Sequence, residues 1–510
     1  MADTELSYLA RFAAAEREVP QRPAVVDAGR VVSYSEFASL VRRLAYALVD
    51  AQAGSRVLIH LPQSSEAFAA MFAVGVSGGF YATTNVAAPP ERRRGTFEAF
   101  GPNIIVTNAD LADEARALCP SARLVTVASL GQNELTAPAE PHELAYVMFT
   151  SGTTGRPKGV MISKAALSHY VDWVMSAMDV RANDRWSQHA NIAFDLSVLD
   201  IYGALCAGAA LVPITGADLL MPAAAVRRHQ LTIWNSVPSV LTSMIKIKQA
   251  TGKNFQTLRM LTFCGEPLQR LHVESIFAAR PDVIVHNTYG PTEATVSCTL
   301  LRLDSANYEE ACQSTVAIGD PIPGIGIDLI DGPDDSCGEI VITGPQLAAG
   351  YWNDPDATAA KFRRYEKDGR EKFGYFTGDW AHRVGKHVFF RSRIDTQVKI
   401  RGERVELDDI AAALMRCGRG FACALLIGDE LHGVFECETA VVGDQALHAT
   451  IARYLPLHLI PSRFHALREL PRSPNGKVDL GTIRTWIEAL PQDATDAVAV
   501  PNRAGTGGSG

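Results

Sequence analysis

The chain has 510 residues, more than a single hydrophobic core usually supports, so two or more domains are expected. Apolar residues make up 47% and charged residues 20% of the sequence, an ordinary globular composition that excludes a disordered or fibrous protein. The net charge of −8 argues against a protein that binds nucleic acid through the phosphate backbone, since such proteins carry a basic face or stripe.

Targeting and redox signals indicate the cytoplasm. The nine cysteines show no C-x-x-C pair and no cluster with histidine at metal-ligand spacing, so free thiols in a reducing compartment are expected. The N-terminus carries acidic residues where a signal peptide needs basic ones, and no apolar run approaches the ~20 residues of a membrane helix. We therefore expect a soluble cytoplasmic protein with no membrane partner.

Strand-like runs alternate with helix-like stretches in the N-terminal part of the chain. Residues 57–61 are a short apolar run typical of a buried strand, and residues 64–76 follow as a helix that begins at a serine cap. Further strands are predicted at 104–107 and 124–127, with a helix at 111–118 between them. Strands that alternate with helices predict βαβ units and a parallel sheet.

The same alternation continues after residue 180 and then changes character. Four more strands, separated by helical stretches, are predicted at 211–214, 233–237, 260–263 and 283–286. Beyond residue 317, segments 325–330 and 339–342 flank the turn-rich sequence Asp-Gly-Pro-Asp-Asp, which predicts antiparallel β-structure. Residues from about 396 onward resemble a small separate α+β unit.

Two segments carry no such pattern. Residues 91–94, Glu-Arg-Arg-Arg, are a local basic cluster that we interpret as a solvated loop. Residues 501–510 are rich in Gly and Ser, which predicts a flexible tail.

The first segment that suggests chemistry is 146–160, YVMFTSGTTGRPKGV. It joins an apolar strand to a Ser/Thr/Gly loop that ends in Lys158, and such a loop can turn backbone N–H groups and hydroxyls toward a polyphosphate. It is not a Walker A loop, because Pro157 precedes the lysine and Gly159 follows it. Taken alone, this segment could also be a Gly/Ser-rich turn with no binding function.

Further motifs in register remove most of this ambiguity. They are NTYGPTEAT at 287–295, FTGD at 376–379, SRIDTQVKIRGERVEL at 392–407 and NGKVDL at 475–480. In this order and spacing the chain, from about residue 20 to 485, resembles the adenylate-forming superfamily of acyl-CoA synthetases, luciferases and nonribosomal-peptide adenylation domains. One departure is Ser392, where the family usually has Gly before the arginine.

The resemblance implies an α/β fold: a large N-terminal domain of stacked α/β sheets plus a β-barrel-like portion, followed by a small mobile C-terminal α+β domain. The expected boundaries are 1–393 for the adenylation core, 394–397 for the hinge, 398–490 for the lid domain and 491–510 for a flexible tail.

The resemblance also implies a site for ATP and Mg²⁺. Thr292 would touch the α-phosphate, Glu293 would hold Mg²⁺, Tyr289 would stack on adenine, and Asp379 would accept hydrogen bonds from the ribose hydroxyls, with Arg393 nearby. The loop around the leaving phosphates and the remaining nucleotide-binding positions would be Thr150, Ser151, Gly152, Thr153, Thr154, Gly155, Lys158, Gly265, Glu266, Asn287, Thr288 and Gly290.

The small domain would act twice. Lys477, in the N-G-K motif, would bridge the carboxylate and α-phosphate oxygens, and a cation there is worth about 10²–10³ in rate. After adenylation the domain would rotate at Asp395, withdraw the lysine, and present the face from Lys399 to Gly402 to an incoming thiol. Without the other motifs, Lys477 would be interpreted as a solvent-exposed turn residue.

Asp195, in FDLSVLDIY, indicates the substrate class. A carboxylate at a buried position is costly unless it is paired with a cation. In amino-acid-activating members the aspartate at this position binds the substrate α-ammonium, so the substrate is expected to carry an amino group. The alternative is a capping or surface aspartate.

The surrounding segments resemble D-alanine–carrier-protein ligases. Besides Asp195, Gly290 and Lys477, the substrate-binding residues would be Phe194, Leu196, Leu199, Ser236, Cys264, Thr288 and Val296. Two leucines and a cysteine leave little room, so alanine is the first prediction, followed by glycine, serine or a small β-amino acid. Cys264 can equally be ordinary buried packing.

The expected acceptor is a separate acyl or peptidyl carrier protein, because few residues follow the lysine motif. Two alternatives remain. An acyl-CoA synthetase would depend on free coenzyme A and accept acids without an amino group. A non-catalytic nucleotide-binding scaffold on the same fold would not need Glu293, Asp379 and Lys477, all of which are present.

Overall fold

The structure is a computed structural model. The residues it describes are 7–27, 29–49, 54–135, 137–150, 157–333, 336–393, 397–400, 403–417, 421–437, 445–472, 478–490 and 498–499.

The first sheet is parallel at its centre and antiparallel at both edges. Over the described part of the chain it has nine strands, in the order β15 (Asp320–Pro321), β14 (Thr299–Leu303), β13 (Ile284–Tyr289), β12 (Met260–Phe263), β11 (Ile233–Ser236), β9 (Arg185–Gln188), β10 (Ala210–Pro213), β1 (Pro23–Asp27) and β2 (Arg30–Ser33). Strands β13 to β1 run parallel, and β14, β15 and β2 run antiparallel to their neighbours.

The second sheet also has a parallel core. Within the described ranges its seven strands are, in order, β18 (Gly350–Tyr351), β8 (Lys158–Ser163), β7 (Leu144–Thr150), β4 (Phe80–Thr83), β3 (Arg56–His60), β5 (Ile104–Thr107) and β6 (Arg123–Thr126). Strands β7 and β8 are antiparallel neighbours, and Thr150 pairs with Lys158 where the two strands approach the loop between them.

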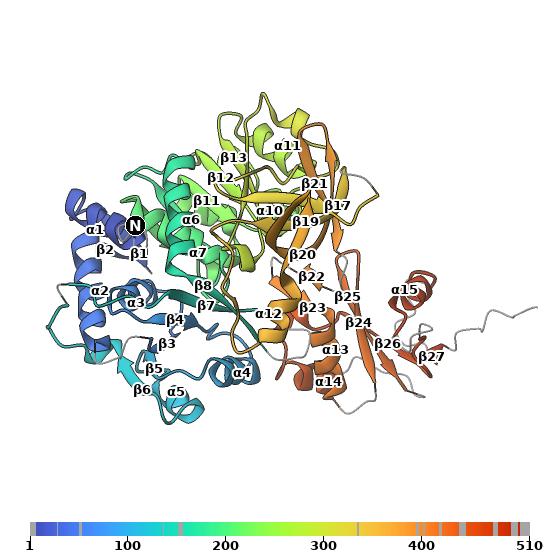
Figure 1. Ribbon diagram of the computed structural model, residues 1–510, viewed down its shortest axis with the longest axis horizontal. Helices are drawn as coiled ribbons and strands as arrows, with labels where there is room; N and C mark the ends of the chain where they lie inside the picture. The colour runs from blue at the N-terminus through green and yellow to red at the C-terminus, as the bar shows by residue number, and fades with distance from the viewer. Residues whose placement is uncertain are drawn as a thin grey trace, which may run out of the picture.

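Helices cover and join these two sheets (Figure 1). In the described chain they are α1 (Ser7–Glu18), α2 (Tyr34–Leu48), α3 (Ser65–Val76), α4 (Pro90–Phe100), α5 (Ala112–Leu118), α6 (Lys164–Ala177), α7 (Leu196–Cys206), α8 (Ala217–Leu220), α9 (Pro222–Arg228), α10 (Pro238–Lys246), α11 (Arg270–Ala279) and α12 (Pro355–Lys361). Short 3₁₀ turns lie at η1 (Val127–Ser129), η2 (Thr292–Ala294), η3 (Tyr308–Ala311) and η4 (Leu457–Leu459).

Helix α7 is buried on every side, as its almost wholly apolar sequence requires. It contacts the first sheet through Trp186 on β9, whose indole N–H donates to Asp200 at 3.0 Å. It contacts the second sheet through Tyr202, whose hydroxyl lies 3.2 Å from that of Tyr81 on β4. The helix is therefore held between the sheets, and this fixes the position of Asp195 at its N-terminus.

A third, antiparallel sheet forms the barrel-like portion. Its strands are β16 (Gly326–Ile330), β17 (Cys337–Thr343), β20 (Arg370–Val384), β19 (Phe362–Lys367) and β21 (His387–Arg393). The register of β20 and β21 sets Asp379 opposite Arg393.

The C-terminal elements form a smaller unit, drawn in orange and red on the right of Figure 1. They are β22 (Gln397–Ile400), β23 (Glu403–Glu406), α13 (Leu407–Met415), β24 (Ala422–Ile427), β25 (Glu430–Glu436), α14 (Gln445–Ile451), β26 (Arg463–Leu467), α15 (Leu480–Glu488) and β27 (Val498–Ala499). The buried side chains of this unit form clusters separate from those of the sheets before it, so it has its own hydrophobic core.

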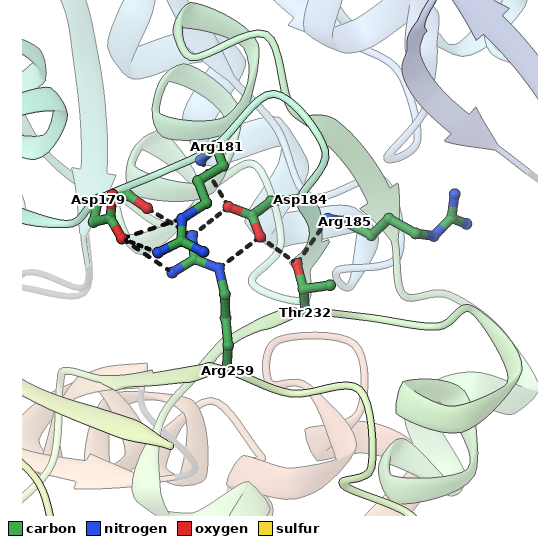
Figure 2. Close-up of polar contacts among 6 residues, drawn as sticks. All are labelled: Asp179, Arg181, Asp184, Arg185, Thr232 and Arg259. Carbon is green, nitrogen blue, oxygen red and sulfur yellow. Dashed lines mark hydrogen bonds and ion pairs between the residues drawn. The ribbon is translucent and has the colours of Figure 1, made fainter. Parts of the chain in front are cut away.

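A polar network joins the amino ends of three strands of the first sheet (Figure 2). The buried carboxylate of Asp184 accepts a hydrogen bond of 2.8 Å from Arg259 Nε and one of 2.7 Å from the Thr232 hydroxyl. Thr232 in turn accepts from the backbone N–H of Arg185 at 2.9 Å. These residues lie at the starts of β9, β11 and β12, so the network ties the strands together at the edge of the sheet away from their carboxyl ends.

Most predicted elements are confirmed. The strands expected at 104–107 and 260–263 are β5 and β12, and the helix expected at 64–76 is α3, whose cap Ser64 accepts from the backbone N–H of Ala67. The interpretation of 91–94 as a solvated loop is wrong, because these residues form the first turns of α4. No helix in the described ranges is long and apolar enough to cross a membrane.

Candidate active site

A cavity of about 100 Å³ lies at the carboxyl ends of the parallel strands. Open α/β sheets place their ligands in this position, outside the carboxyl ends of the strands. Its walls come from both large sheets, from the barrel-like sheet and from β22: Arg92, Met148, Phe149, Thr150, Ala193, Phe194, Asp195, Leu196, Val237, Cys264, Gly265, Gly290, Pro291, Thr292, Val296, Asp379, Arg393 and Lys399.

The segment before α7 carries Phe194 and Asp195 to the cavity wall. The backbone N–H of Phe194 donates to the Asn191 carbonyl at 2.9 Å, and the Ser197 hydroxyl donates to the Phe194 carbonyl at 2.7 Å. The side chain of Asn191 also donates to Gln63 at 3.2 Å, which attaches this turn to the second sheet. Asp195 is therefore a carboxylate held in place by its backbone at one wall of a small cavity.

The wall beside Asp195 is largely apolar, with Leu196, Val237, Cys264 and Val296. Burial raises the pKa of the Cys264 thiol, so this side chain stays neutral and acts as a small apolar group. Val296 has a backbone φ of 69°, a left-handed conformation that is rare for a β-branched residue. A strained backbone of this kind is typical of functional sites, and here it carries Val296 to the cavity.

Three of the predicted pocket residues do not line the cavity. Leu199, Ser236 and Thr288 are all buried, and the Thr288 hydroxyl donates to the Phe263 carbonyl at 3.1 Å. They support the cavity wall from within the protein rather than forming its surface.

Asp379 is the centre of a buried polar cluster. Its carboxylate accepts a hydrogen bond of 2.7 Å from the Tyr289 hydroxyl and forms an ion pair with Arg393. Arg393 also donates to the Thr377 carbonyl at 3.1 Å. Burial and the neighbouring Asp379 carboxylate raise the pKa of Tyr289 well above its usual value, so the phenol keeps its proton. A carboxylate fixed in this way can still accept further hydrogen bonds from a ligand.

A second cluster surrounds Glu293. This carboxylate is buried and accepts a 2.7 Å hydrogen bond from the Tyr351 hydroxyl. The Lys158 ammonium lies 3.9 Å from the centroid of the same tyrosine ring. Tyr351 therefore connects a residue at the end of the phosphate-loop candidate with the carboxylate beside Thr292.

The residues present fit a Mg²⁺ ion bound together with phosphates. No group of three or more metal-ligating side chains occurs within the described ranges, so no all-protein cage is found there. Mg²⁺ is commonly held by one or two carboxylates together with substrate phosphates and waters. The buried Glu293, next to the cavity-lining Thr292, matches that donor set.

Besides Thr288, two further residues predicted to bind nucleotide are engaged elsewhere. Glu266 accepts hydrogen bonds from the backbone N–H and the hydroxyl of Ser239, at 2.8 and 3.1 Å, near the N-terminus of α10. Asn287 is buried and donates to the Ala317 carbonyl at 2.8 Å. Their neighbours Gly265 and Gly290 do line the cavity.

Several predicted residues fall outside the described ranges. They are Ser151, Gly152, Thr153, Thr154 and Gly155 of the loop, Asp395 of the expected hinge, Gly402, and Lys477. Lys399, from the face expected to meet a thiol, lines the cavity together with residues of the large sheets.

Sequence reasoning missed Arg92, Met148, Phe149, Ala193, Val237 and Pro291, which also line the cavity. Met148 and Phe149 belong to the strand at the start of the 146–160 segment, so their position directly before its loop was an available signal. Arg92 had a weaker signal, because Pro90 at the first turn and the left-handed Gly101 after the last turn are typical helix boundaries.

Comparison with known proteins identifies the family. A model of the AMP-binding enzyme family matches residues 12–352. Among curated proteins, the chain is similar to zwittermicin A synthase ZmaJ of Bacillus cereus, with 29% identity over 486 residues covering 90% of this chain and 91% of ZmaJ. It is also similar to the AMB antimetabolite synthetase AmbB of Pseudomonas aeruginosa, with 33% identity over 494 residues. That match covers 92% of this chain but only 38% of AmbB, so the chain spans little more than a third of that synthetase.

Solved structures agree in fold. The Vibrio cholerae adenylation domain AlmE, in complex with glycyl-adenosine-5′-phosphate, matches with a TM-score of 0.81 and 25% identity, over 95% of this chain and 98% of AlmE. The nonribosomal peptide synthetase FmoA3 matches with a TM-score of 0.68 and 27% identity, over 76% of this chain and 42% of FmoA3. The chain therefore belongs to the AMP-binding enzyme family and is an adenylate-forming enzyme similar to the adenylation domains of nonribosomal peptide synthetases.

Proposed function

We propose that this enzyme activates a small amino acid, with alanine as the first candidate, and passes it to the thiol of a carrier protein. In the first step a carboxylate oxygen of the amino acid attacks the α-phosphorus of ATP, the bond to the β-phosphate oxygen breaks, and pyrophosphate leaves. In the second step the phosphopantetheine thiol attacks the acyl carbon, loses its proton, and AMP leaves.

The observation that carries this proposal is a carboxylate, Asp195, beside the apolar part of the wall of a small cavity. A substrate ammonium would form an ion pair with that carboxylate, whereas a fatty or aryl acid carries no cation to pair with it. Leu196, Cys264 and Val296 leave space for a short side chain only, and a pocket of this kind separates substrates that differ by one methylene by about 1–3 kcal/mol.

The nucleotide would occupy the other side of the cavity. Asp379, fixed by Tyr289 and Arg393, would accept the ribose hydroxyls. Thr292 would donate to an α-phosphate oxygen, and Lys158 would face the leaving phosphates. Mg²⁺ held by Glu293 would neutralise charge on the phosphate oxygens. The barrier would be lowered chiefly by positioning and by this neutralisation.

The small C-terminal unit would serve both steps. Lys477 would bridge the substrate carboxylate and the α-phosphate in adenylation, as the family resemblance implies. Lys399, which lines the cavity, would lie on the path of the incoming thiol, with rotation at Asp395 exchanging the two faces. The expected domains, 1–393 and 398–490, are the two bodies that such a rotation would move.

The names of similar proteins support a small amino acid and a role in peptide or antimetabolite synthesis. AlmE binds a glycyl-adenylate in its solved structure, and FmoA3 and AmbB are peptide or antimetabolite synthetases. Glycine is therefore the second candidate after alanine, followed by serine and a small β-amino acid.

The test is pyrophosphate release with ATP and Mg²⁺, with the adenylate trapped by hydroxylamine. Purified enzyme would be given D-alanine, L-alanine, glycine, serine, β-alanine, acetate and benzoate in parallel. Selective turnover of one small amino acid is the expected result, and the same assay shows its chirality. Preference for acetate or benzoate would replace the proposal with an acyl-CoA synthetase, which dependence on free coenzyme A would then identify.

A further inference from the structure

Three consecutive arginines on α4 have three different environments. Arg93 is 16% exposed and forms an ion pair with Glu114 at 2.6 Å. Arg94 is 53% exposed and lies 3.6 Å from Glu91. Arg92 is half-buried and lines the active-site cavity. In the part of the chain that the structure describes, no hydrogen bond or ion pair engages the Arg92 guanidinium.

Helix α4 packs against the phosphate-loop candidate. Gly95, one turn after Arg92, faces that segment, and a Cβ added there would lie in van der Waals contact with the Pro157 ring, at 3.4 Å. At the far end of the helix, the Trp352 indole donates to the Ala99 carbonyl at 3.2 Å. The ion pair of Arg93 fixes the first turn to α5. The backbone that carries Arg92 is therefore anchored on both sides of the residue.

The reactants bring phosphate groups to this cavity, whose wall also carries the cations Lys399 and Arg393. Arg393, another cation on the wall, is already paired with Asp379. ATP brings a triphosphate, and a phosphopantetheine arm brings a phosphodiester. A planar guanidinium offers two parallel N–H donors that match two oxygens of a phosphate group. Such charge-assisted hydrogen bonds are stronger than hydrogen bonds between neutral groups.

We propose that Arg92 binds a phosphate group of the reactants at the active-site cavity. This inference rests on the proposed function, because that function supplies the phosphate. Two sources share the chemistry: the phosphate tail of ATP and the phosphate of the pantetheine arm. Arg92 acts by direct contact with the reactant, while Arg93 holds the helix and Arg94 lies on its surface.

The test compares Arg92→Ala and Arg92→Lys with Arg94→Ala as the matched surface control. The KM for ATP is measured by pyrophosphate exchange. The KM for the thiol is measured with holo-carrier protein, with free phosphopantetheine and with pantetheine, which lacks the phosphate. Loss of a hydrogen bond to a charged group predicts that Arg92→Ala raises the KM for one phosphate-bearing reactant about tenfold or more. The Arg92→Lys variant keeps the positive charge, so its KM lies between those of wild type and Arg92→Ala. The Arg94→Ala variant changes neither KM.

The pattern identifies the source of the phosphate. A higher KM for ATP alone indicates the triphosphate. A higher KM for phosphopantetheine but not for pantetheine indicates the arm. Unchanged KM values for ATP and for both thiols in Arg92→Ala overturn the inference. If the wild-type enzyme adenylates none of the acids tested, the proposed function fails instead, and equilibrium binding of ATP and phosphopantetheine to wild type and Arg92→Ala still decides the role of Arg92.

Discussion

Tyr351 is the residue that connects the two charged groups next to the phosphate site. Its hydroxyl donates to Glu293 at 2.7 Å, and its ring faces the Lys158 ammonium at 3.9 Å. The phenol can thus orient the carboxylate that we propose for Mg²⁺, since partners of this kind fix the geometry of metal ligands.

The Tyr351→Phe variant removes the hydroxyl and keeps the ring. We expect the Mg²⁺ concentration for half-maximal pyrophosphate exchange to rise about tenfold, because a hydrogen bond to a charged group contributes roughly 1.5–3 kcal/mol. The matched control is Tyr365→Phe, whose hydroxyl bonds Asp328 in the barrel-like sheet at 2.5 Å, away from the cavity. Equal Mg²⁺ requirements in the two variants would contradict the role of Tyr351.

Cys264 provides a second prediction at the scale of single residues. Replacing this cavity-lining thiol by alanine enlarges the side-chain pocket. Activity should therefore shift toward an amino acid with one more methylene. The ratio of the kcat/KM values for the two amino acids should change by an amount that corresponds to about 1–3 kcal/mol. The control is Cys298→Ala, which removes a buried thiol that does not line the cavity. A change of specificity in both variants, or in neither, would contradict the assignment of Cys264 to the pocket wall.

At the scale of elements, the Asp184 network joins the starts of β9, β11 and β12. Arg259→Ala leaves Asp184 buried without its cation, so we expect a loss of unfolding free energy of about 3 kcal/mol, seen as a lower midpoint in urea. Arg364→Ala breaks an exposed pair with Glu371, and exposed pairs contribute only about 0–1 kcal/mol. Equal midpoints for the two variants would show that the network is not stabilising.

Elements were predictable where their signals are local. The run at 260–263 became β12 because four consecutive apolar or β-branched residues between polar segments favour a buried strand. The solvated loop is the wrong interpretation of residues 91–94 because three consecutive arginines are typical of a charged surface segment, whereas the signals of a helix, Pro90 and Gly101, lie at the two ends of α4. Its helical form is fixed by those ends and by packing against distant segments such as Trp352.

At the scale of the whole molecule, histidines with lowered pKa values make stability depend on pH. Burial lowers the pKa of His189, His272, His286 and His465 to about 4. The unfolded chain binds these protons near pH 6.5, so the stabilising effect of the neutral rings is fully present above that pH and is lost as the pH falls toward 4.

The His286→Leu variant tests this dependence. Each such histidine makes the free energy of unfolding fall by up to about 1.4 kcal/mol for each pH unit of acidification. The variant lacks one of these histidines, so it should lose less stability than wild type between pH 6.5 and 5. The measurement is the urea midpoint of both proteins at each pH. A wild-type midpoint that stays constant or rises on acidification would contradict the expected direction.

The cavity was predictable only in part, because it depends on which distant segments meet. Asp195, Cys264 and Asp379 belong to recognisable motifs, and all three line the cavity. Arg92 lies outside the motifs and Val237 directly follows the expected pocket residue Ser236. Only the packing of α4 and the order of the strands bring Arg92 and Val237 to the same wall. Burial of Leu199 behind that wall likewise follows from the position of α7 between the sheets.

The most direct test of the central claim compares alanine with propionate, which lacks only the amino group, in pyrophosphate exchange by wild type and Asp195→Asn. If Asp195 binds the substrate ammonium, wild type strongly prefers alanine, and the variant loses that preference mainly through a higher KM for alanine. If wild type uses propionate as well as alanine, or if Asp195→Asn keeps the preference, Asp195 does not bind the ammonium and the amino-acid assignment is wrong.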